Sequence, residues 1–438
     1  MPLAPPSPAV RPSLWSTVSI RRRRLLLAGA AVAGGSLLAR CTRASAARAD
    51  GAGPAGLLEV CTPWTSGPEA NGLLALLADF KGRAPDVTFT EGSAAGDAGA
   101  ALERRLAAGD PPDSFHCRGG EELAAQVADG RLECLDALFA EQGWEDVLPP
   151  ALLPRLRVRG GYYAVPAGVR RANLLWSSPA VLDEAGADPA PRSVTELLAG
   201  LRRVAAAGLL PLAVGGLQGV AQWLETLLLA ALGPQAWTAL WQPGADWSGP
   251  RVAGALHDLA AVLALAGEVD AGEGWAEATR LVGTDRAGYQ LTGDWAEGAL
   301  RETLGLRPST GYRWAVAPGT DGVFQCRVDA FTLPRGARHR RAALAWLAEC
   351  GSLDGQLALN GARGAVPART GLPESARALF GPYPRWSLEQ WDGGRPLDSL
   401  AHGGLLGAAR RAAVDEALRA FLAHRDPARL GNDLAGGA

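Results

Sequence analysis

Short apolar runs alternate with helical stretches from Leu57 onwards, and this alternation constrains the fold more than any other feature of the sequence. The predicted segments are a strand at 57–61, an amphipathic helix from Leu73 to Phe80, a strand at 87–89, a helix at 98–108 and a strand at 114–117. Strands that alternate with helices form a largely parallel sheet covered by helices. Ligands of such sheets bind beyond the carboxyl ends of the strands, so the loops after Thr62 and around His116 are candidate binding loops.

The chain has 438 residues, more than one hydrophobic core usually serves, so two lobes are expected. Extended runs at 162–166, 328–333 and 364–368 predict three crossings between the lobes. Several crossings form a hinge of parallel strands rather than a loose linker, a build suited to closure around a ligand.

These crossings define two discontinuous lobes. The first is predicted to comprise 57–166 with 328–365, and the second 167–327 with 366–430. The second lobe is expected to hold helices near 194–206, 221–232 and 252–265, and short strands near Leu212 and Tyr289. We therefore predict an α/β fold in which each lobe is a largely parallel sheet flanked by helices, with a ligand cleft between the lobes.

Composition excludes several classes of function. The net charge is −2 and charged residues make up 20% of the chain, which is typical of a globular body and not of a nucleic-acid binder. Lys81 follows Phe80 rather than the glycine that a phosphate-binding GxxxxGK[ST] loop requires, so no ATPase motif is present. The six cysteines form no CxxC pair, and we expect neither a structural metal nor a cofactor. Buried thiols acting as small apolar groups are the preferred interpretation.

The first 49 residues are predicted to form an export signal and a disordered leader. Four arginines at 21–24 precede an apolar run at 25–39, and small residues follow at 44–49. The arginine cluster resembles a twin-arginine signal, which indicates an exported, periplasmic or cell-surface protein. A membrane anchor is the alternative, but spanning a bilayer needs about 20 apolar residues. Lipidation of Cys41 is a further alternative, although Arg40 stands where a lipobox has a small residue.

Seven short strings, in their shared order and spacing, carry a resemblance to a known family. They are Trp64-Thr65-Ser66-Gly67-Pro68-Glu69, Pro112-Asp113-Ser114-Phe115, Tyr163-Ala164-Val165-Pro166, Ala172-Asn173-Leu174-Leu175-Trp176, Gly293-Asp294-Trp295-Ala296, Gly319-Thr320-Asp321-Gly322-Val323-Phe324 and Val366-Pro367-Ala368-Arg369. Over most of the mature chain, the sequence resembles the glucose- and mannose-binding branch of bacterial extracellular solute-binding proteins.

This resemblance implies a type II periplasmic-binding-protein fold in a monomer that hands a carbohydrate to the permease subunits of an ATP-driven importer. A pyranose has an apolar C–H face and a rim of hydroxyls, so its site needs an aromatic plate and hydrogen-bond acceptors. Trp64 and Glu69, with Thr65 between them, supply such groups in the first strand-to-helix loop. The alternatives are core packing for Trp64 and a helix N-terminal carboxylate for Glu69.

A second group of candidates lies in the second lobe. The resemblance gives Asp294 a role as acceptor of sugar hydroxyls and Trp247 a role in stacking on the sugar. Gly293 lets the backbone approach the ligand, and Trp295 follows directly. The alternatives are a helix N-cap for Asp294 and packing on the helix from Val252 for Trp247.

The remaining candidates depart from the family pattern. His116 and Arg118 stand where relatives have glutamine and histidine, and both have structural or solvent-exposed alternatives. Gln218 occupies the position of a second family tryptophan, so one stacking plate is missing there. Asp329 falls in the hinge segment. Its preferred interpretation is hydrogen bonding within the hinge rather than direct contact with a ligand.

Two other classes of function compete with transport. Glu69 and Asp294 could converge as the paired carboxylates of a glycoside hydrolase or lyase, but no GxSxG, HExxH or comparable signature is present. We therefore expect no enzyme. The departures at Arg118 and Gln218 keep open a diverged binding protein that acts as a sensor or interaction module, or that binds a different solute.

Overall fold

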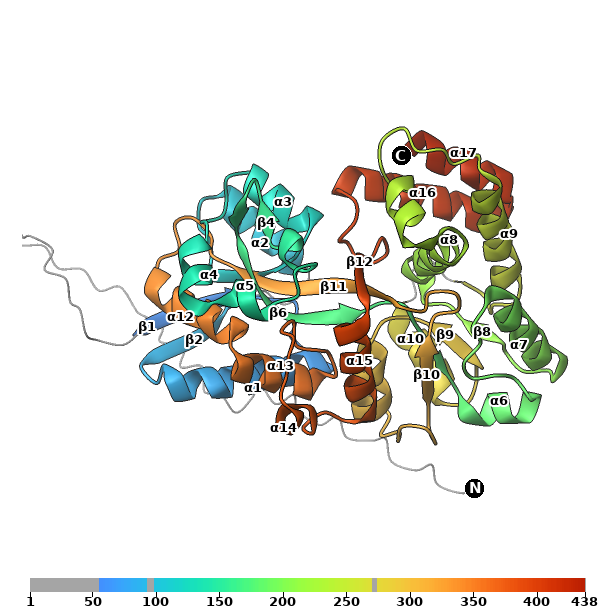
Figure 1. The fold of residues 1–438 in the computed structure, drawn as a ribbon, viewed down its shortest axis with the longest axis horizontal. Helices are drawn as coiled ribbons and strands as arrows, with labels where there is room; N and C mark the ends of the chain where they lie inside the picture. Colours follow the sequence, from blue (N-terminus) through green and yellow to red (C-terminus); the bar gives the residue numbers. More distant parts are fainter. Residues whose placement is uncertain (1–54, 93–97, 270–273, 438) are drawn as a thin grey trace, which may run out of the picture. The chain divides into compact units, whose positions relative to one another are not determined.

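The structure is a computed structural model that describes residues 55–92, 98–269 and 274–437. The predicted export signal, the leader and Cys41 lie outside these residues. Within them, buried apolar side chains form two large cores, and Figure 1 shows one group of elements around each core. The predicted two-lobed α/β fold is confirmed.

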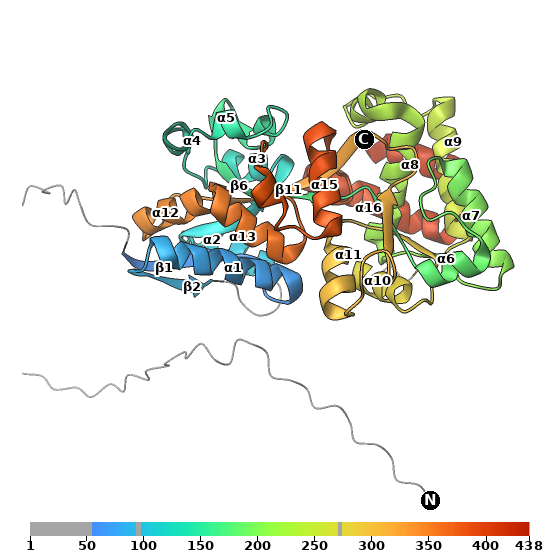
Figure 2. The same cartoon turned by 60° about the horizontal axis from the view of Figure 1, so that its bottom comes forward.

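The first lobe is built around a sheet with helices on both sides. Its elements are β1 (Gly56–Cys61), α1 (Gly67–Arg83), β2 (Val87–Glu91), α2 (Ala98–Ala107), β3 (Ser114–Arg118), α3 (Glu121–Ala128), α4 (Asp136–Gln142), α5 (Trp144–Val147), η2 (Leu153–Arg155), β4 (Arg157–Val158), β5 (Gly161–Tyr162), α12 (Arg340–Gly351), α13 (Leu353–Arg363), α14 (Glu374–Arg377) and α15 (Pro382–Gly393). Figures 1 and 2 show α1, α12 and α13 side by side on one face of this sheet.

Three strands connect the lobes and belong to the sheet of the first lobe. They are β6 (Ala164–Arg171), β11 (Val323–Thr332) and β12 (Arg395–Asp398). The strand order is β12-β11-β3-β1-β2, with β6 on the other side of β11. The pairs β1–β2 and β1–β3 are parallel, so the predicted βαβαβ unit is confirmed. β11 runs antiparallel to β3 and to β6.

The second lobe holds a smaller sheet and most of the long helices. Its elements are β7 (Leu174–Ser177), α6 (Pro179–Ala185), α7 (Val194–Ala206), β8 (Leu212–Ala213), α8 (Gly216–Leu240), α9 (Pro250–Ala264), α10 (Trp275–Gly283), β9 (Tyr289–Leu291), α11 (Trp295–Gly298), the π-helix η3 (Ala299–Thr303), β10 (Arg313–Val316), α16 (Ala408–His424) and α17 (Pro427–Gly437). The predicted helix at 194–206 has these same bounds, because Ser193 caps it by accepting a hydrogen bond from the Glu196 N–H at 3.2 Å.

The prediction of a largely parallel sheet is wrong for the second lobe. In the order β10-β7-β9-β8, the pairs β10–β7 and β7–β9 are antiparallel and only β8–β9 is parallel. The reason lies in the hinge. The chain enters this lobe along β7, directly after β6, and leaves it along β10 before β11, so the entering and leaving strands run in opposite directions. A count of alternating strands and helices does not contain this information.

The segment after the third predicted crossing packs differently from its predicted assignment to the second lobe. Leu372, Phe380 and Leu388 are buried in the first core. On the other side of α15, Tyr383 and Trp386 pack in a small aromatic cluster with Trp176 of the second lobe. This stretch therefore lines the hinge, and the chain joins the second lobe only after β12.

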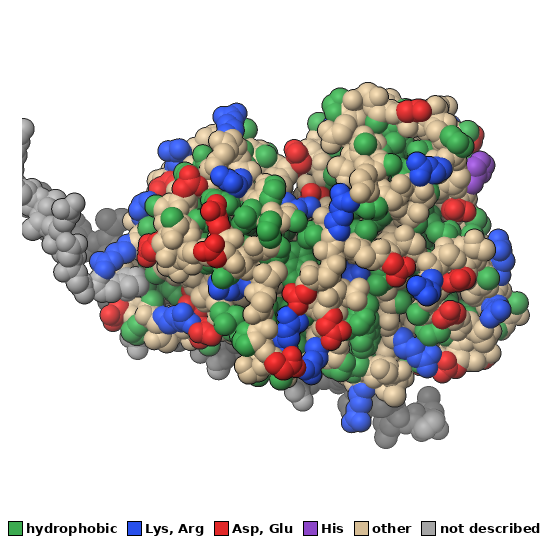
Figure 3. All heavy atoms as spheres, in the orientation of Figure 1, with side chains coloured by type: hydrophobic (Ala, Val, Ile, Leu, Met, Phe, Trp, Pro, Cys, Tyr) green, Lys and Arg blue, Asp and Glu red, His purple; other side chains and the backbone are tan. Residues whose placement is uncertain are grey.

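The described cysteines are all unpaired, four of them buried and Cys134 exposed. No helix among the described residues is long and apolar enough to cross a membrane. On the face drawn in Figure 3, acidic and basic side chains are interspersed. This pattern agrees with the small net charge and lacks the single-sign field of a nucleic-acid-binding face.

Candidate functional site

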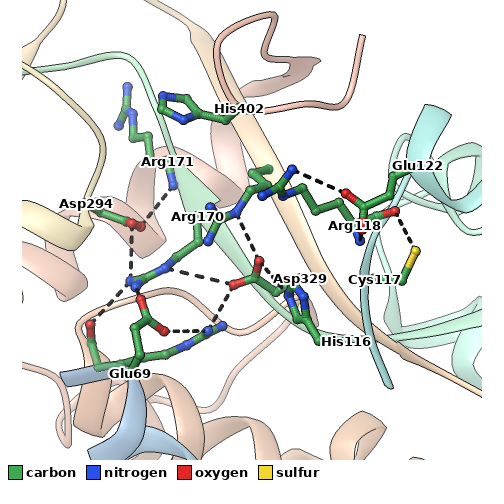
Figure 4. Close-up of polar contacts among 12 residues, drawn as sticks. Glu69, His116, Cys117, Arg118, Glu122, Arg170, Arg171, Asp294, Asp329 and His402 are labelled. Carbon is green, nitrogen blue, oxygen red and sulfur yellow. Dashed lines mark hydrogen bonds and ion pairs between the residues drawn. The ribbon is translucent and has the colours of Figure 1, made fainter. Parts of the chain in front are cut away.

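Arg170 lies where the two lobes meet and joins carboxylates from both of them. It stands on β6 with only 1% of its side chain exposed. Its guanidinium forms an ion pair with Glu69 from α1 of the first lobe, and a second one, at 3.3 Å, with Asp294 from the start of α11 in the second lobe. Asp329 on β11 is 4.0 Å away. Figure 4 shows Arg170 pointing between these three carboxylates. One buried cation therefore bridges the lobes.

Asp329 is fully buried and saturated with donors. Its Oδ1 accepts from His116 Nε2 at 3.3 Å and from Arg327 Nε at 3.0 Å, and its Oδ2 accepts from Arg363 Nη1 at 2.9 Å. Burial alone would raise the pKa of Asp329, but Arg327, Arg363 and His116 outweigh it and hold the pKa well below its usual value. The carboxylate is thus ionised and unavailable to a ligand, as expected for a group that serves the hinge.

Asp294 is also fully buried. Its Oδ2 accepts from the Arg171 backbone N–H at 2.9 Å, and its own backbone N–H donates to the Arg171 carbonyl at 2.9 Å. The side chain makes no capping hydrogen bond to α11, so the N-cap alternative does not describe its contacts. Burial raises the pKa of Asp294 to about 6, although Arg170 and the Arg171 N–H act in the opposite direction. Asp294 fixes the second lobe to β6.

Glu69 is the one carboxylate of this group with measurable exposure, at 24% of its side chain. It lies in the first turn of α1, where the helix dipole favours a negative charge. Its oxygens are nevertheless taken by Arg170 and, at 3.2 Å, by Arg363. We call the ion-paired group the hinge cluster, comprising Glu69, His116, Arg170, Asp294, Arg327, Asp329 and Arg363.

A groove of about 500 Å³ opens beside the hinge cluster, between the N-terminal end of α1 and the segment from α10 to η3. Figure 2 shows α1 end-on to this segment. The lining residues are Pro63, Ser66, Gly67, Pro68, Glu69, Arg170, Trp275, Ala276, Glu277, Thr279, Arg280, Trp295, Ala299, Thr303 and Leu304. We call it the tryptophan groove. It combines two indole rings with the Glu277–Arg280 ion pair, both of whose side chains are more than one-third exposed.

Trp295 is, with Glu69, one of the two predicted candidates that line this groove, and it is partly exposed. Its Nε1–H donates to Thr292 Oγ1 at 3.1 Å. The ring lies over Gly293, where a Cβ atom would stand 2.2 Å from it, so Gly293 serves the indole rather than a ligand. Trp275 meets Trp295 edge to face with centroids 6.3 Å apart, and the Arg327 guanidinium lies 5.6 Å from the ring.

The two tryptophans that were predicted to stack on a sugar, Trp64 and Trp247, lie in the cores. Trp64 is 3% exposed, with His116 at 5.0 Å between centroids and the Arg363 guanidinium 4.5 Å from its ring. Trp247 is 5% exposed and meets Trp241 edge to face at 5.0 Å. Both side chains occupy the core-packing positions that were the alternatives to stacking on a ligand.

His116 and Arg118 border a second, smaller hollow of about 310 Å³ in the first lobe, which Phe115 and Glu122 also line. His116 turns towards Asp329, as Figure 4 shows. Arg118 is 41% exposed and pairs with Glu122 at 3.3 Å.

Thr65, another predicted candidate, is exposed, and its backbone N–H donates to the Pro63 carbonyl.

Gln218 lies exposed in the first turn of α8, away from both hollows. Its Nε2 lies 3.1 Å from His402 Nδ1 and 3.4 Å from the Ala401 carbonyl oxygen.

The sequence analysis missed His402, Trp275 and the hinge arginines Arg170 and Arg363. The pair Arg170–Arg171 at the end of an apolar run was the available signal, since arginine is almost never fully buried without a partner.

No group of His, Cys, Asp and Glu side chains in the described part of the chain is arranged to hold a metal ion. The site therefore consists of a buried, ion-paired hinge and an adjoining aromatic groove. Such a groove can hold a ligand with apolar faces and a polar rim by stacking and hydrogen bonds.

Comparison with known proteins identifies the family to which the chain is similar. The family model for bacterial extracellular solute-binding proteins matches residues 75–378. A probable sugar-binding periplasmic protein of Mesorhizobium japonicum is 31% identical over 349 residues, covering 78% of this chain and 82% of the relative. An uncharacterised ABC transporter extracellular-binding protein of Pyrococcus horikoshii is 25% identical over 378 residues, 84% of each chain.

Among solved structures, a chitin oligosaccharide binding protein matches with a TM-score of 0.75 at 19% identity. The match covers 88% of this chain and 98% of that protein. At this identity the likeness establishes the fold.

Proposed function

Since this chain belongs to the bacterial extracellular solute-binding proteins, we propose that it captures a carbohydrate outside the cytoplasm and delivers it to the permease subunits of an ABC importer. The proposed ligand is a glucose- or mannose-like mono- or oligosaccharide. Relatives named as probable sugar-binding periplasmic proteins support a carbohydrate as the class of ligand.

The observation that carries the proposal is the tryptophan groove. A pyranose presents an apolar C–H face to an indole and hydroxyls to carboxylates and guanidinium groups. The partly buried Trp295 supplies the indole, and the Glu277–Arg280 pair supplies acceptors and donors at the rim. The walls come from both lobes, so closing the lobes would enclose a sugar.

The same geometry supports binding without turnover. A glycoside hydrolase needs two carboxyl groups that flank the glycosidic bond, about 5–9 Å apart. Glu69 and Asp294 both contact Arg170 instead, and Asp294 is inaccessible to a ligand. The carboxylates that suggested an enzyme therefore have a structural use.

Thermal denaturation of the mature chain with a panel of sugars tests the proposal. The panel contains glucose, mannose, xylose and short oligosaccharides. A ligand at about 100 times its dissociation constant adds roughly 2.7 kcal/mol of stability, which raises the melting temperature. Product analysis of the same samples should find the sugar unchanged. A panel in which no carbohydrate raises the melting temperature rejects carbohydrate capture.

One observation favours a second function. Asp294, which the family resemblance assigns to sugar hydroxyls, and the candidate acceptor Glu69 are both paired with Arg170, as in a chain that has exchanged ligand binding for a sensor or interaction role. An unresponsive sugar panel combined with co-purification of a membrane partner would favour this function.

Export rests on the twin-arginine-like sequence, and lipidation of Cys41 is the open alternative. Mass spectrometry of the chain recovered from its native host separates the cases. An unmodified N-terminus beyond residue 41 supports signal cleavage without an anchor, whereas an acylated N-terminal Cys41 supports a lipoprotein.

A further inference from the structure

His402 lies behind Trp295, in the loop that joins β12 to α16. Its side chain is 4% exposed, and its ring meets the indole of Trp295 edge to face, with centroids 4.5 Å apart and an interplanar angle of 68°. Trp295 is the plate that lines the tryptophan groove. His402 therefore contacts the groove residue Trp295 from a buried position and does not itself line the groove.

The orientation of the His402 ring is fixed from both of its nitrogens. Gln222 donates through Nε2 to the Ala172 carbonyl, which turns its Oε1 towards His402 Nε2 at 3.2 Å. An oxygen partner requires the proton on Nε2, so Nδ1 accepts from Gln218 Nε2 at 3.1 Å. Burial lowers the pKa of His402 well below its usual value, and Arg327, Arg411 and Arg118 lower it further. The ring is therefore neutral at pH 7 and packs against Trp295 as an uncharged aromatic group.

Glu225 anchors the loop that carries this ring. It is fully buried on α8, and its Oε2 accepts from the backbone N–H groups of Leu400 at 2.6 Å and Ala401 at 3.2 Å. Ser399 Oγ lies 2.9 Å from Glu225 Oε1 and accepts from the His402 N–H at 3.2 Å. A buried carboxylate that accepts several backbone N–H groups fixes a loop more firmly than exposed contacts do.

We propose that His402 is a positioning residue for ligand binding, which holds the Trp295 ring in the orientation that faces the groove while Glu225 holds the 399–402 loop in place. This inference rests on the proposed function. The indole N–H of Trp295 donates to Thr292, and Gly293 lies against one face of the ring. His402 packs against the ring edge to face, in addition to the contacts of Trp275 and Arg327. Without His402 the ring gains rotational freedom that a ligand has to remove on binding.

The test uses the full mature chain labelled with 5-fluorotryptophan and observed by ¹⁹F NMR. Trp295→Phe identifies the Trp295 resonance by its loss. We expect His402→Ala to shift and broaden that resonance. We also expect it to reduce the affinity for the tightest-binding sugar of the panel about 3- to 10-fold, which is the cost of ordering one side chain. The matched control is His257→Ala, since His257 is exposed on α9 and should change neither reading.

Two further variants keep the proposal falsifiable if His402→Ala folds poorly. Gln218→Ala removes an exposed partner of the ring and should produce a smaller change in the same resonance. Glu225→Gln retains an acceptor for the two N–H groups and should preserve resonance and affinity, whereas Glu225→Leu should change both.

A Trp295 resonance or a sugar affinity that is unchanged in folded His402→Ala overturns the inference and leaves carbohydrate capture intact. Failure of the wild-type chain to bind any sugar rejects carbohydrate capture instead. The ¹⁹F spectra alone then decide whether His402 positions Trp295.

Discussion

The hinge cluster and the tryptophan groove lie side by side and use the same kinds of residue in opposite ways. In the cluster, Asp294 and Asp329 are fully buried, and arginines occupy their oxygens. In the groove, the indole of Trp295 and the Glu277–Arg280 pair stay partly exposed. The presence of carboxylates and aromatic rings alone therefore does not identify a binding site. What separates structural from ligand-binding groups here is whether protein partners have already satisfied them.

The largest difference is expected from removing one arginine on each side of this comparison. Arg170→Met leaves Asp294 buried without its bridging cation and should cost about 3–5 kcal/mol of unfolding free energy in urea denaturation. Arg280→Met breaks an exposed pair and should leave the urea midpoint nearly unchanged. Equal losses in the two variants would erase the distinction between cluster and groove.

The second prediction concerns pH and the buried Asp294. Because burial raises its pKa from 3.8 to about 6, the folded state holds its proton more tightly than the unfolded state. The resulting stability is fully present below pH 3.8 and is lost as the pH rises through 6. The unfolding free energy of the wild type relative to Asp294→Asn should therefore fall by about 2 kcal/mol between pH 4 and pH 7. A pH-independent difference would show that Asp294 titrates normally and that its burial is overstated.

Two tryptophans provide the third contrast. Trp295→Ala removes the groove plate and should weaken sugar binding about 10- to 100-fold in isothermal titration, since stacking and apolar burial together contribute about 1.5–3 kcal/mol. Trp247→Ala should instead lower the melting temperature, because it leaves a cavity in the second core, and should leave the affinity of the folded fraction unchanged. The reverse pattern would indicate that Trp247, and not Trp295, stacks on the sugar.

The smallest effect is expected at Arg118. Its pair with Glu122 is exposed, so Arg118→Gln should change stability by less than about 1 kcal/mol and leave sugar affinity within experimental error. A tenfold loss of affinity would move the ligand from the tryptophan groove to the hollow beside His116.

Local patterns predicted much of the fold. The strands β1, β2 and β3, their parallel pairing and the position of α7 followed from periodicity. The antiparallel pairs β10–β7 and β7–β9 did not, because strand direction depends on how the chain enters and leaves the second lobe through the hinge.

The sequence predicted which residue types gather at the candidate site. It did not predict which of them serve the structure and which line the groove. Glu69, Asp294 and Asp329 do gather near one place, yet burial of Arg170 and Arg363 among them is a tertiary property that no spacing reveals. Tryptophans are similarly ambiguous, since the same residue type fills a core at 247 and lines a groove at 295.

A crystal structure with the tightest-binding sugar of the panel tests the account most directly. We predict a pyranose ring stacked on Trp295 in the tryptophan groove, with Arg170 still paired to Glu69 and Asp294. A sugar whose hydroxyls bind Glu69 and Asp294, with Arg170 displaced, would contradict the account.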